Sequence, residues 1–112
     1  MVGYRGHRER WVAVKYDVKF TVKIDDPEVL LTDLFEALPE VPSVVYIHIE
    51  GSDTLVAVCK DVESSGLMAL PEAMRKTQVK LSHAFRAVSP VFSARGGLLW
   101  SDIVAADVRT AE

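Results

Sequence analysis

The sequence predicts an α+β domain whose strands and helices follow the order βαββαβ, and three observations predict it. Apolar residues occupy every even position from Val12 to Ile24, which is the period-two pattern of a half-buried strand. Two further segments rich in β-branched residues, 43–50 and 54–60, are joined by a short turn that contains glycine, as in a β-hairpin. Apolar residues at helical spacing follow both the first strand and this hairpin.

The first strand, residues 11–24, is the longest regular segment of the chain. Its even positions hold β-branched and aromatic side chains, which suit a pleated surface. Its odd positions include Lys15, Lys19 and Lys23. We therefore expect a central strand that has one face in the core and carries three lysines on the other.

A helix is predicted after this strand. The segment Asp25-Asp26-Pro27-Glu28 combines an acidic cap, a proline suited to the first turn and a first-turn glutamate. Pro39 ends the helix because a proline disfavours helical backbone in the residue before it. The apolar face of the helix is expected to comprise Leu31, Leu34, Phe35 and Leu38.

The hairpin that follows supplies two strands. In residues 43–50 the alternation directs Val45, Ile47 and Ile49 toward the core. Residues 54–60 are apolar on both faces, so this strand is expected in the interior of the sheet with its second face at least partly covered.

The second half of the chain predicts a helix over residues 65–76, a strand over 81–89 and a short C-terminal helix within 98–108. The sheet order is then 4-1-3-2, antiparallel, which makes the strand 81–89 a neighbour of the strand 11–24. This is the ferredoxin-like, or RRM-like, α/β sandwich. We expect residues 1–10 to form a basic arm and residues 11–112 to form a single domain.

Length and composition fit a globular domain. The chain has 112 residues, of which 49% are hydrophobic and 26% are charged. No apolar segment approaches the roughly 20 residues of a membrane span, and the N-terminus is too polar for a signal peptide. The single cysteine, Cys59, rules out an internal disulfide and a Cys-rich zinc site. We expect a cytoplasmic protein that makes no contact with a membrane.

Charge is distributed unevenly although the net charge is only −3. Residues 1–24 carry six basic and two acidic side chains, and residues 25–72 carry one basic and eleven acidic side chains. Residues 73–95 carry five basic side chains and no acid. If the strands 11–24 and 81–89 are neighbours, two basic segments combine into one surface.

Catalytic and metal-binding patterns are missing. The chain has no Gly-rich phosphate loop, no Gly-x-Ser-x-Gly turn and no histidines at metal-ligand spacing. Cys59 lies in an apolar strand and fits a small core residue better than a nucleophile. The strand 54–60 also lacks the aromatic residues that stack bases in an RNA recognition motif. RNA contact would therefore depend on attraction to phosphate groups.

Seven short segments together carry a resemblance to a known family. They are Arg8-Glu9-Arg10-Trp11-Val12, Asp33-Leu34-Phe35, Ser64-Ser65-Gly66-Leu67, Ala69-Leu70-Pro71, Ala84-Phe85-Arg86, Val88-Ser89-Pro90 and Ala94-Arg95-Gly96-Gly97. In order and spacing they resemble parts of the small protein subunits of archaeal and eukaryotic ribonuclease P. The first segment resembles the basic entry into the family's first strand, and the second lies where the family's first helix ends. The others resemble the family's last helix, last strand and following Gly-containing loop.

This resemblance implies an RRM-like fold and a non-catalytic role. In the family, the RNA hydrolyses a phosphodiester of precursor tRNA with magnesium, and the protein pairs with a larger RNase P protein subunit. The resemblance therefore implies ribonuclease P RNA and precursor tRNA as partners of this chain. It also implies that the chain has no catalytic or metal-binding residue and binds no cofactor. The candidate phosphate contacts are Arg5, Arg8, Arg10, Lys15, Lys19, Lys80, Arg86 and Arg95.

Two other classes of protein stay open. Leu38-Pro39-Glu40-Val41 and Gly51-Ser52-Asp53-Thr54-Leu55-Val56 resemble the ligand-binding domain of leucine-responsive regulators, which pair through their sheets and bind effectors at subunit interfaces. A dimeric α/β-barrel enzyme would require a polar pocket, for which the sequence offers no candidate residues.

Overall fold

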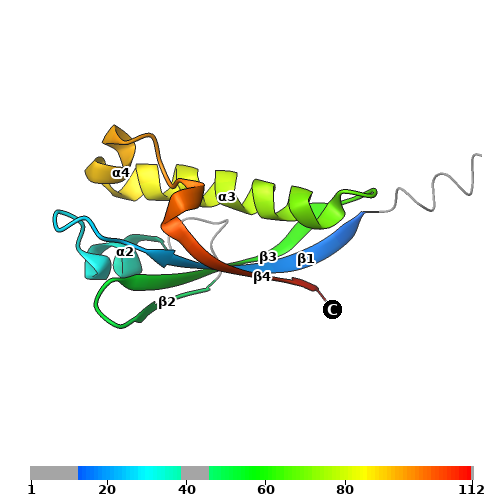
Figure 1. The fold of residues 1–112 in the computed structure, drawn as a ribbon, viewed down its shortest axis with the longest axis horizontal. Coiled ribbons are helices and arrows are strands. Elements are labelled where there is room, and N and C mark those ends of the chain that lie inside the picture. The colour runs from blue at the N-terminus through cyan, green and yellow to red at the C-terminus, as the bar shows by residue number, and fades with distance from the viewer. Residues whose placement is uncertain (1–12, 39–45, 112) are drawn as a thin grey trace, which may run out of the picture.

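The computed structural model describes residues 13–38 and 46–111. Its elements in chain order are β1 (Val14–Lys23), α2 (Leu31–Ala37), β2 (Tyr46–Glu50), β3 (Thr54–Ser64), α3 (Ala69–Val88), α4 (Pro90–Ala94), the 3-10 turn η2 (Trp100–Asp102) and β4 (Ile103–Thr110). The four described strands form one antiparallel sheet in the order β2-β3-β1-β4, and α3 lies across one face of it (Figure 1). The predicted α+β, ferredoxin-like class and the 4-1-3-2 order are confirmed. The predicted arm, residues 1–10, lies outside the described residues.

The central strand β1 has the two faces that its alternation predicts. Its even residues from Tyr16 to Val22, and Ile24 directly after the strand, are buried in the core, which also contains residues of α3. We call this side of the sheet the helix face and the opposite side the far face. The register places Lys15, Lys19 and Lys23 of β1 on the far face.

Strand β3 lies between β1 and β2, which explains why it is apolar on both faces. Leu55 on the helix face and Val56 on the far face are both fully buried. The strand does not end at residue 60, as predicted, but continues to Ser64 through a bulge. There Asp61 has a positive φ of 56°, and its N–H donates to Asp17 Oδ1 at 3.3 Å. The helix predicted from residue 65 accordingly begins later, at Ala69.

The first helix begins later than its acidic cap predicts. Asp26 forms a turn instead, in which its Oδ1 accepts the N–H of Glu28 at 2.9 Å and its carbonyl accepts the N–H of Val29 at 3.1 Å. Helix α2 then starts at Leu31, and its residue Leu34 is buried as predicted. Phe35, expected on the same apolar face, is 42% exposed.

Helix α3 is 20 residues long and includes residues 81–88 of the segment 81–89 that was predicted as a strand, so that prediction is wrong. The buried residues Thr77, Leu81, Ala84 and Phe85 recur at helical rather than alternate spacing. Pro71 does not interrupt the helix. It lies in the first turn, where backbone N–H groups have no partner within the helix.

The C-terminal segment is a strand and not the predicted helix. Only the turn η2 is helical within 98–108, and β4 follows it from Ile103 to Thr110. In Figure 1 the chain descends from α4 through η2 to the edge of the sheet, where β4 pairs with β1. Because β4 takes the place expected for residues 81–89, the second basic segment does not join the sheet.

Aromatic rings connect the layers of the core. The rings of Phe85 and Phe92 meet edge to face at 4.9 Å between centroids, which fastens α4 onto α3. Phe20 of β1 meets Trp100 of η2 at 5.9 Å in the same manner. Among the described residues, no helix combines the length and the apolar character that crossing a membrane requires.

Candidate nucleic-acid interface

The predicted phosphate contacts that lie within the described residues do not form one surface. Lys15 and Lys19 are exposed on the far face of β1, whereas Lys80 and Arg86 are exposed on α3, on the other side of the sheet (Figure 1). Arg95 follows α4. Three more candidates lie outside the described residues: Arg5, Arg8 and Arg10. The expectation that two basic strands lie side by side is therefore wrong.

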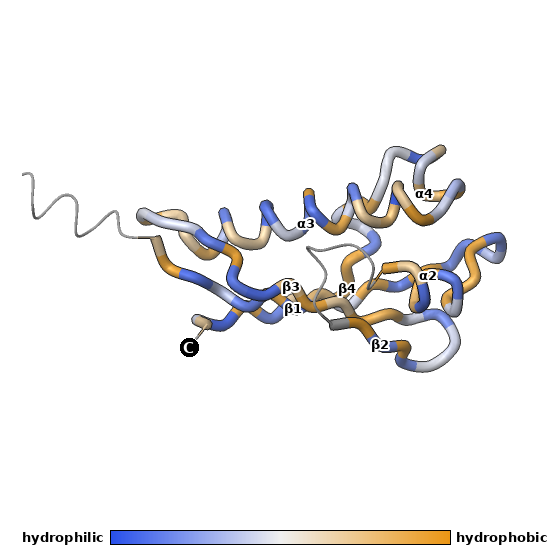
Figure 2. Tube along the Cα trace, turned by 180° about the vertical axis from the view of Figure 1, so that it is seen from behind, coloured by the Kyte–Doolittle hydropathy of each residue, from blue (hydrophilic) through white to orange (hydrophobic). Residues whose placement is uncertain are grey.

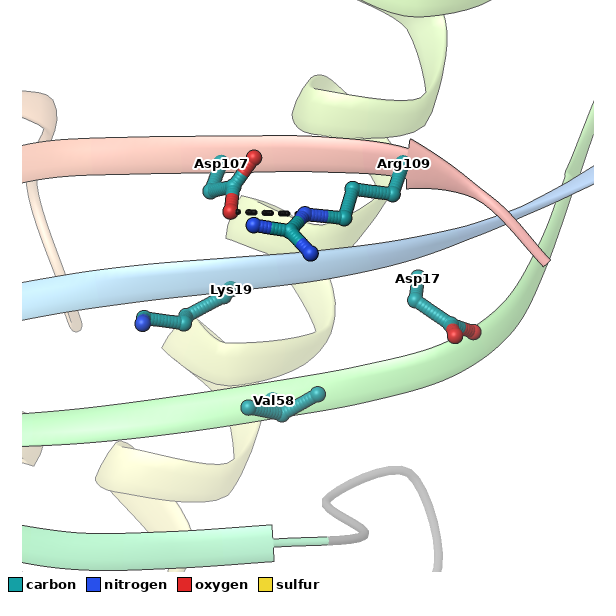
Figure 3. Close-up of a pocket in the computed structure, with 5 residues that line it drawn as sticks. All are labelled: Asp17, Lys19, Val58, Asp107 and Arg109. Carbon is teal, nitrogen blue, oxygen red and sulfur yellow. Dashed lines mark hydrogen bonds and ion pairs between the residues drawn. The ribbon is translucent and has the colours of Figure 1, made fainter.

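The far face carries charges of both signs in close alternation. A shallow hollow of about 230 Å³ is lined by Asp17, Lys19, Val58, Asp107 and Arg109. Figure 3 shows these side chains on β1, β3 and β4, with α3 behind the sheet. Arg109 Nε donates to Asp107 Oδ2 at 3.1 Å. Since the four charges cancel, this surface has little net attraction for a polyanion.

Lys23, the last residue of β1, is also balanced by acidic neighbours. Its Nζ lies 4.0 Å from a carboxylate oxygen of Asp25 and 4.0 Å from one of Asp53. Lys15 lies opposite Glu63 of β3 in the register of the sheet, so all three lysines of β1 have acidic neighbours and do not form a basic patch.

Helix α3 carries most of the basic side chains of the second half of the chain. Its single acid is Glu72, and it has four basic residues. These are Arg75, Lys76, Lys80 and Arg86. At 3.6 residues per turn they fall within an arc of about 140°, which also contains the exposed His83. The buried residues of α3 occupy a separate arc that faces the sheet, and Figure 2 shows hydrophilic and hydrophobic residues recurring along the helix. We call the four basic residues Arg75, Lys76, Lys80 and Arg86 the α3 cationic arc.

Two members of the α3 cationic arc have local partners. Arg75 Nη2 donates to Glu72 Oε1 at 2.7 Å, and this hydrogen bond lowers the pKa of Glu72 and raises the pKa of Arg75. Lys76 Nζ donates to the carbonyl of Glu63 at 2.7 Å. Within the described ranges, Lys80 and Arg86 make no ion pair shorter than 4.0 Å.

Arg95 has a structural role. Its Nη2 donates to both carboxylate oxygens of Asp102, at 2.7 and 2.8 Å, and its guanidinium lies 4.9 Å from the centre of the Phe92 ring. Asp102 Oδ2 also accepts the N–H of Leu99 at 2.9 Å. These contacts clamp the loop between α4 and β4.

Sequence reasoning omitted two members of the arc, Arg75 and Lys76, and also Arg109 on the far face. The signal for the first two was present, because residues 73–95 contain five basic residues and no acid. Division of this segment into a helix and a strand separated residues that in fact share one helix face.

No side-chain cluster for covalent or metal chemistry occurs in the parts of the chain that the structure describes. No group of three His, Cys, Asp or Glu residues there could hold a metal ion. Cys59 is buried in β3, and burial raises the pKa of its thiol to about 11, so it is protonated at neutral pH.

Comparison with known proteins adds no relative: no family model and no curated protein matches the chain. A functional proposal for this chain therefore rests on its fold, on the α3 cationic arc and on the short segments that resemble the ribonuclease P subunits.

Proposed function

We propose that this chain is a non-catalytic, RNA-binding subunit of a ribonucleoprotein, and that the complex is ribonuclease P. The α3 cationic arc is the observation that carries the RNA-binding part of the proposal. Four cations and one acid lie along a helix of about 30 Å, and among the described residues Arg75 is the only one of these cations in an ion pair shorter than 4.0 Å. The assignment to ribonuclease P rests on the sequence resemblance alone.

The α3 cationic arc suits a phosphate backbone rather than a small anion. Lys76, Lys80 and Arg86 are separated along the helix axis by about 6 and 9 Å, so they reach successive phosphates of a strand or a groove. A surface of this kind gives affinity and orientation without reading bases. Catalysis would remain with the RNA and its magnesium, while the protein would support that RNA and contact a larger protein subunit.

Charge reversal on each side of the sheet tests which face binds RNA. We expect Lys80→Glu/Arg86→Glu to weaken binding of ribonuclease P RNA at least tenfold, roughly the effect of losing two phosphate contacts. The control is Lys15→Glu/Lys19→Glu on the far face, which changes the net charge equally and should weaken binding less than about threefold. Fluorescence anisotropy with labelled RNA measures both variants.

Two results would count against this proposal. Equal losses in the two double variants would mean that affinity follows net charge and not the α3 cationic arc. Wild-type protein that binds no RNA, but is stabilised against heat by free amino acids, would favour the ligand-sensing alternative. The hollow on the far face, with its two cations and two carboxylates, would then be the place to look for a zwitterion.

A further inference from the structure

Strand β4 presents an unoccupied edge of the sheet. It pairs with β1 on one side, and no other strand in residues 13–38 or 46–111 pairs with its second side. The strand contains neither proline nor lysine, two residues that commonly protect such edges from pairing.

The hydrogen-bond pattern of β4 shows which of its backbone groups face outward. The N–H of Ala111 donates to the carbonyl of Lys15 at 2.8 Å, so Ala111 directs its backbone groups toward β1. In an antiparallel pair this direction alternates from residue to residue. Ala106, Val108 and Thr110 therefore direct both their N–H and their C=O groups away from β1, toward the outer edge.

The side chains of β4 continue a charge pattern that starts on β1. On the far face, Asp17 of β1 lies opposite Arg109, and Lys19 lies opposite Asp107. Each of these two cross-strand pairs forms a row that leads from a charge on β1 to the opposite charge on β4, at the outer edge of the sheet. A strand that continued the alternation would place a cation beside Asp107 and an anion beside Arg109.

We propose that β4 pairs antiparallel with β4 of a second copy of this chain, centred on Val108. Val108 then lies opposite Val108 of the second copy, and Ala106 lies opposite Thr110. All of these residues direct their backbone groups toward the new partner. Asp107 of each copy lies opposite Arg109 of the other, so the rows read Asp17–Arg109–Asp107–Lys19 across the junction. On the helix face the two Val108 side chains form a β-branched pair.

Other registers of two β4 strands lose this match. A register centred on Asp107 would place the Asp107 carboxylates of the two copies opposite each other. A register centred on Arg109 would place their two guanidinium groups opposite each other. Centring on Ala106 would place the charged side chains opposite Ala105 and Ile103. Only the centre at Val108 joins unlike charges and still uses the outward backbone groups. This pairing is independent of the α3 cationic arc and of the proposed RNA.

Cysteine cross-linking tests both the contact and its register. In a hydrogen-bonded antiparallel pair the opposite Cα atoms are about 5.5 Å apart, within the range of a disulfide. We expect Val108→Cys to form a covalent dimer under mild oxidation. Ala106→Cys alone should not form a covalent dimer, because the two cysteines, one in each chain, would be about 13 Å apart along the strands. A mixture of Ala106→Cys and Thr110→Cys chains should form the mixed dimer.

Sedimentation of the full chain tests the charge pattern. We expect wild-type protein to dimerise reversibly, and Arg109→Asp to raise the dimer Kd about tenfold because it sets carboxylates opposite each other. The exchanged variant Asp107→Arg/Arg109→Asp restores unlike pairs between the copies. Within each copy it sets like charges opposite Asp17 and Lys19, but it does so in monomer and dimer alike, so the Kd should return to within about threefold of wild type. Far-UV circular dichroism shows whether each variant is folded.

Two outcomes would overturn the proposal. One is wild-type protein that sediments as a monomer up to a concentration of about 1 mM. The other is cross-linking of Ala106→Cys alone as readily as of Val108→Cys, which would mean that the strands do not adopt this register.

Discussion

Cys59 illustrates at the scale of one residue how burial controls chemistry. Its side chain is 1% exposed in β3, and removal of the thiolate from water raises the pKa from 9.0 to about 11. The nearby charge of Lys80 lowers it by a smaller amount. The thiol is thus a core residue in the folded protein, as its apolar strand predicts.

The raised pKa of Cys59 predicts a loss of stability in alkali. A thiol that ionises at about 11 when folded and near 9.0 when unfolded stabilises the fold fully below pH 9, and this contribution is lost as the pH rises toward 11. By pH 11 the free energy of unfolding should fall by roughly 2 kcal/mol from this group. Urea unfolding measures the change.

Cys59→Ala is the control for this prediction, because lysines and tyrosines also titrate in the same pH range. The variant should be less stable at neutral pH, owing to the lost side-chain volume, but its stability should decline less between pH 9 and 11. Identical pH profiles for the two proteins would contradict the prediction.

At the scale of an element, α3 shows why the second half of the chain was misread. The apolar residues from Val79 to Val88 include several strand formers, and a proline lies near each end of the segment predicted as helix and strand. The pattern of buried side chains decides between a strand and a helix. Leu81, Ala84 and Phe85 are buried, while Val79 and His83 are exposed, which is the pattern of a helix and not of alternation.

Alanine substitutions test this burial pattern. Leu81→Ala removes a fully buried side chain and should lower the free energy of unfolding by about 3 kcal/mol through lost contacts and a cavity. Val79→Ala, at a position that is 40% exposed, should cost less than about 1 kcal/mol. Residues 79 and 81 would share one face in a strand, so similar losses at both positions would argue against the helix. Chemical unfolding of the two variants provides the comparison.

At the scale of the whole molecule, the sheet separates two surfaces of different character. The far face is balanced in charge and ends at the outer edge of β4, whereas the exposed side of α3 is basic. A chain with a net charge of −3 thus has a basic surface on one side, because α3 carries four cations and a single acid.

This separation predicts the salt dependence of RNA binding. Phosphate contacts release counterions, so the logarithm of the affinity should fall linearly with the logarithm of the salt concentration. Removing Lys80 and Arg86 together by substitution with glutamine should make this slope shallower by about 1.5. Titrations at several salt concentrations measure the slope. An unchanged slope in the glutamine variant would place the phosphate contacts outside the α3 cationic arc.

The candidate site could be predicted only in part. The basic character of residues 73–95 was visible in the sequence. The ion pair between Arg95 and Asp102 was not, because the two residues are seven positions apart and meet only after the loop folds over Phe92. The alternation of charge between β1 and β4 likewise depends on a register between distant segments.

The sequence by itself determined the central strand, the interior place of β3 and the class of the fold. The alternation of apolar and polar residues is a local property that can be read without the structure, and the apolar side of β1 has to be covered by other elements. Only the tertiary structure decided which segment completes the sheet. Residues 81–89 and 103–110 both contain strand formers, but a long helix over 69–88 buries Leu81 and Phe85 against β1 and β3. The remaining edge of β1 then pairs with β4, and this pairing places the cations of α3 on one side of the molecule and the charge rows of the sheet on the other.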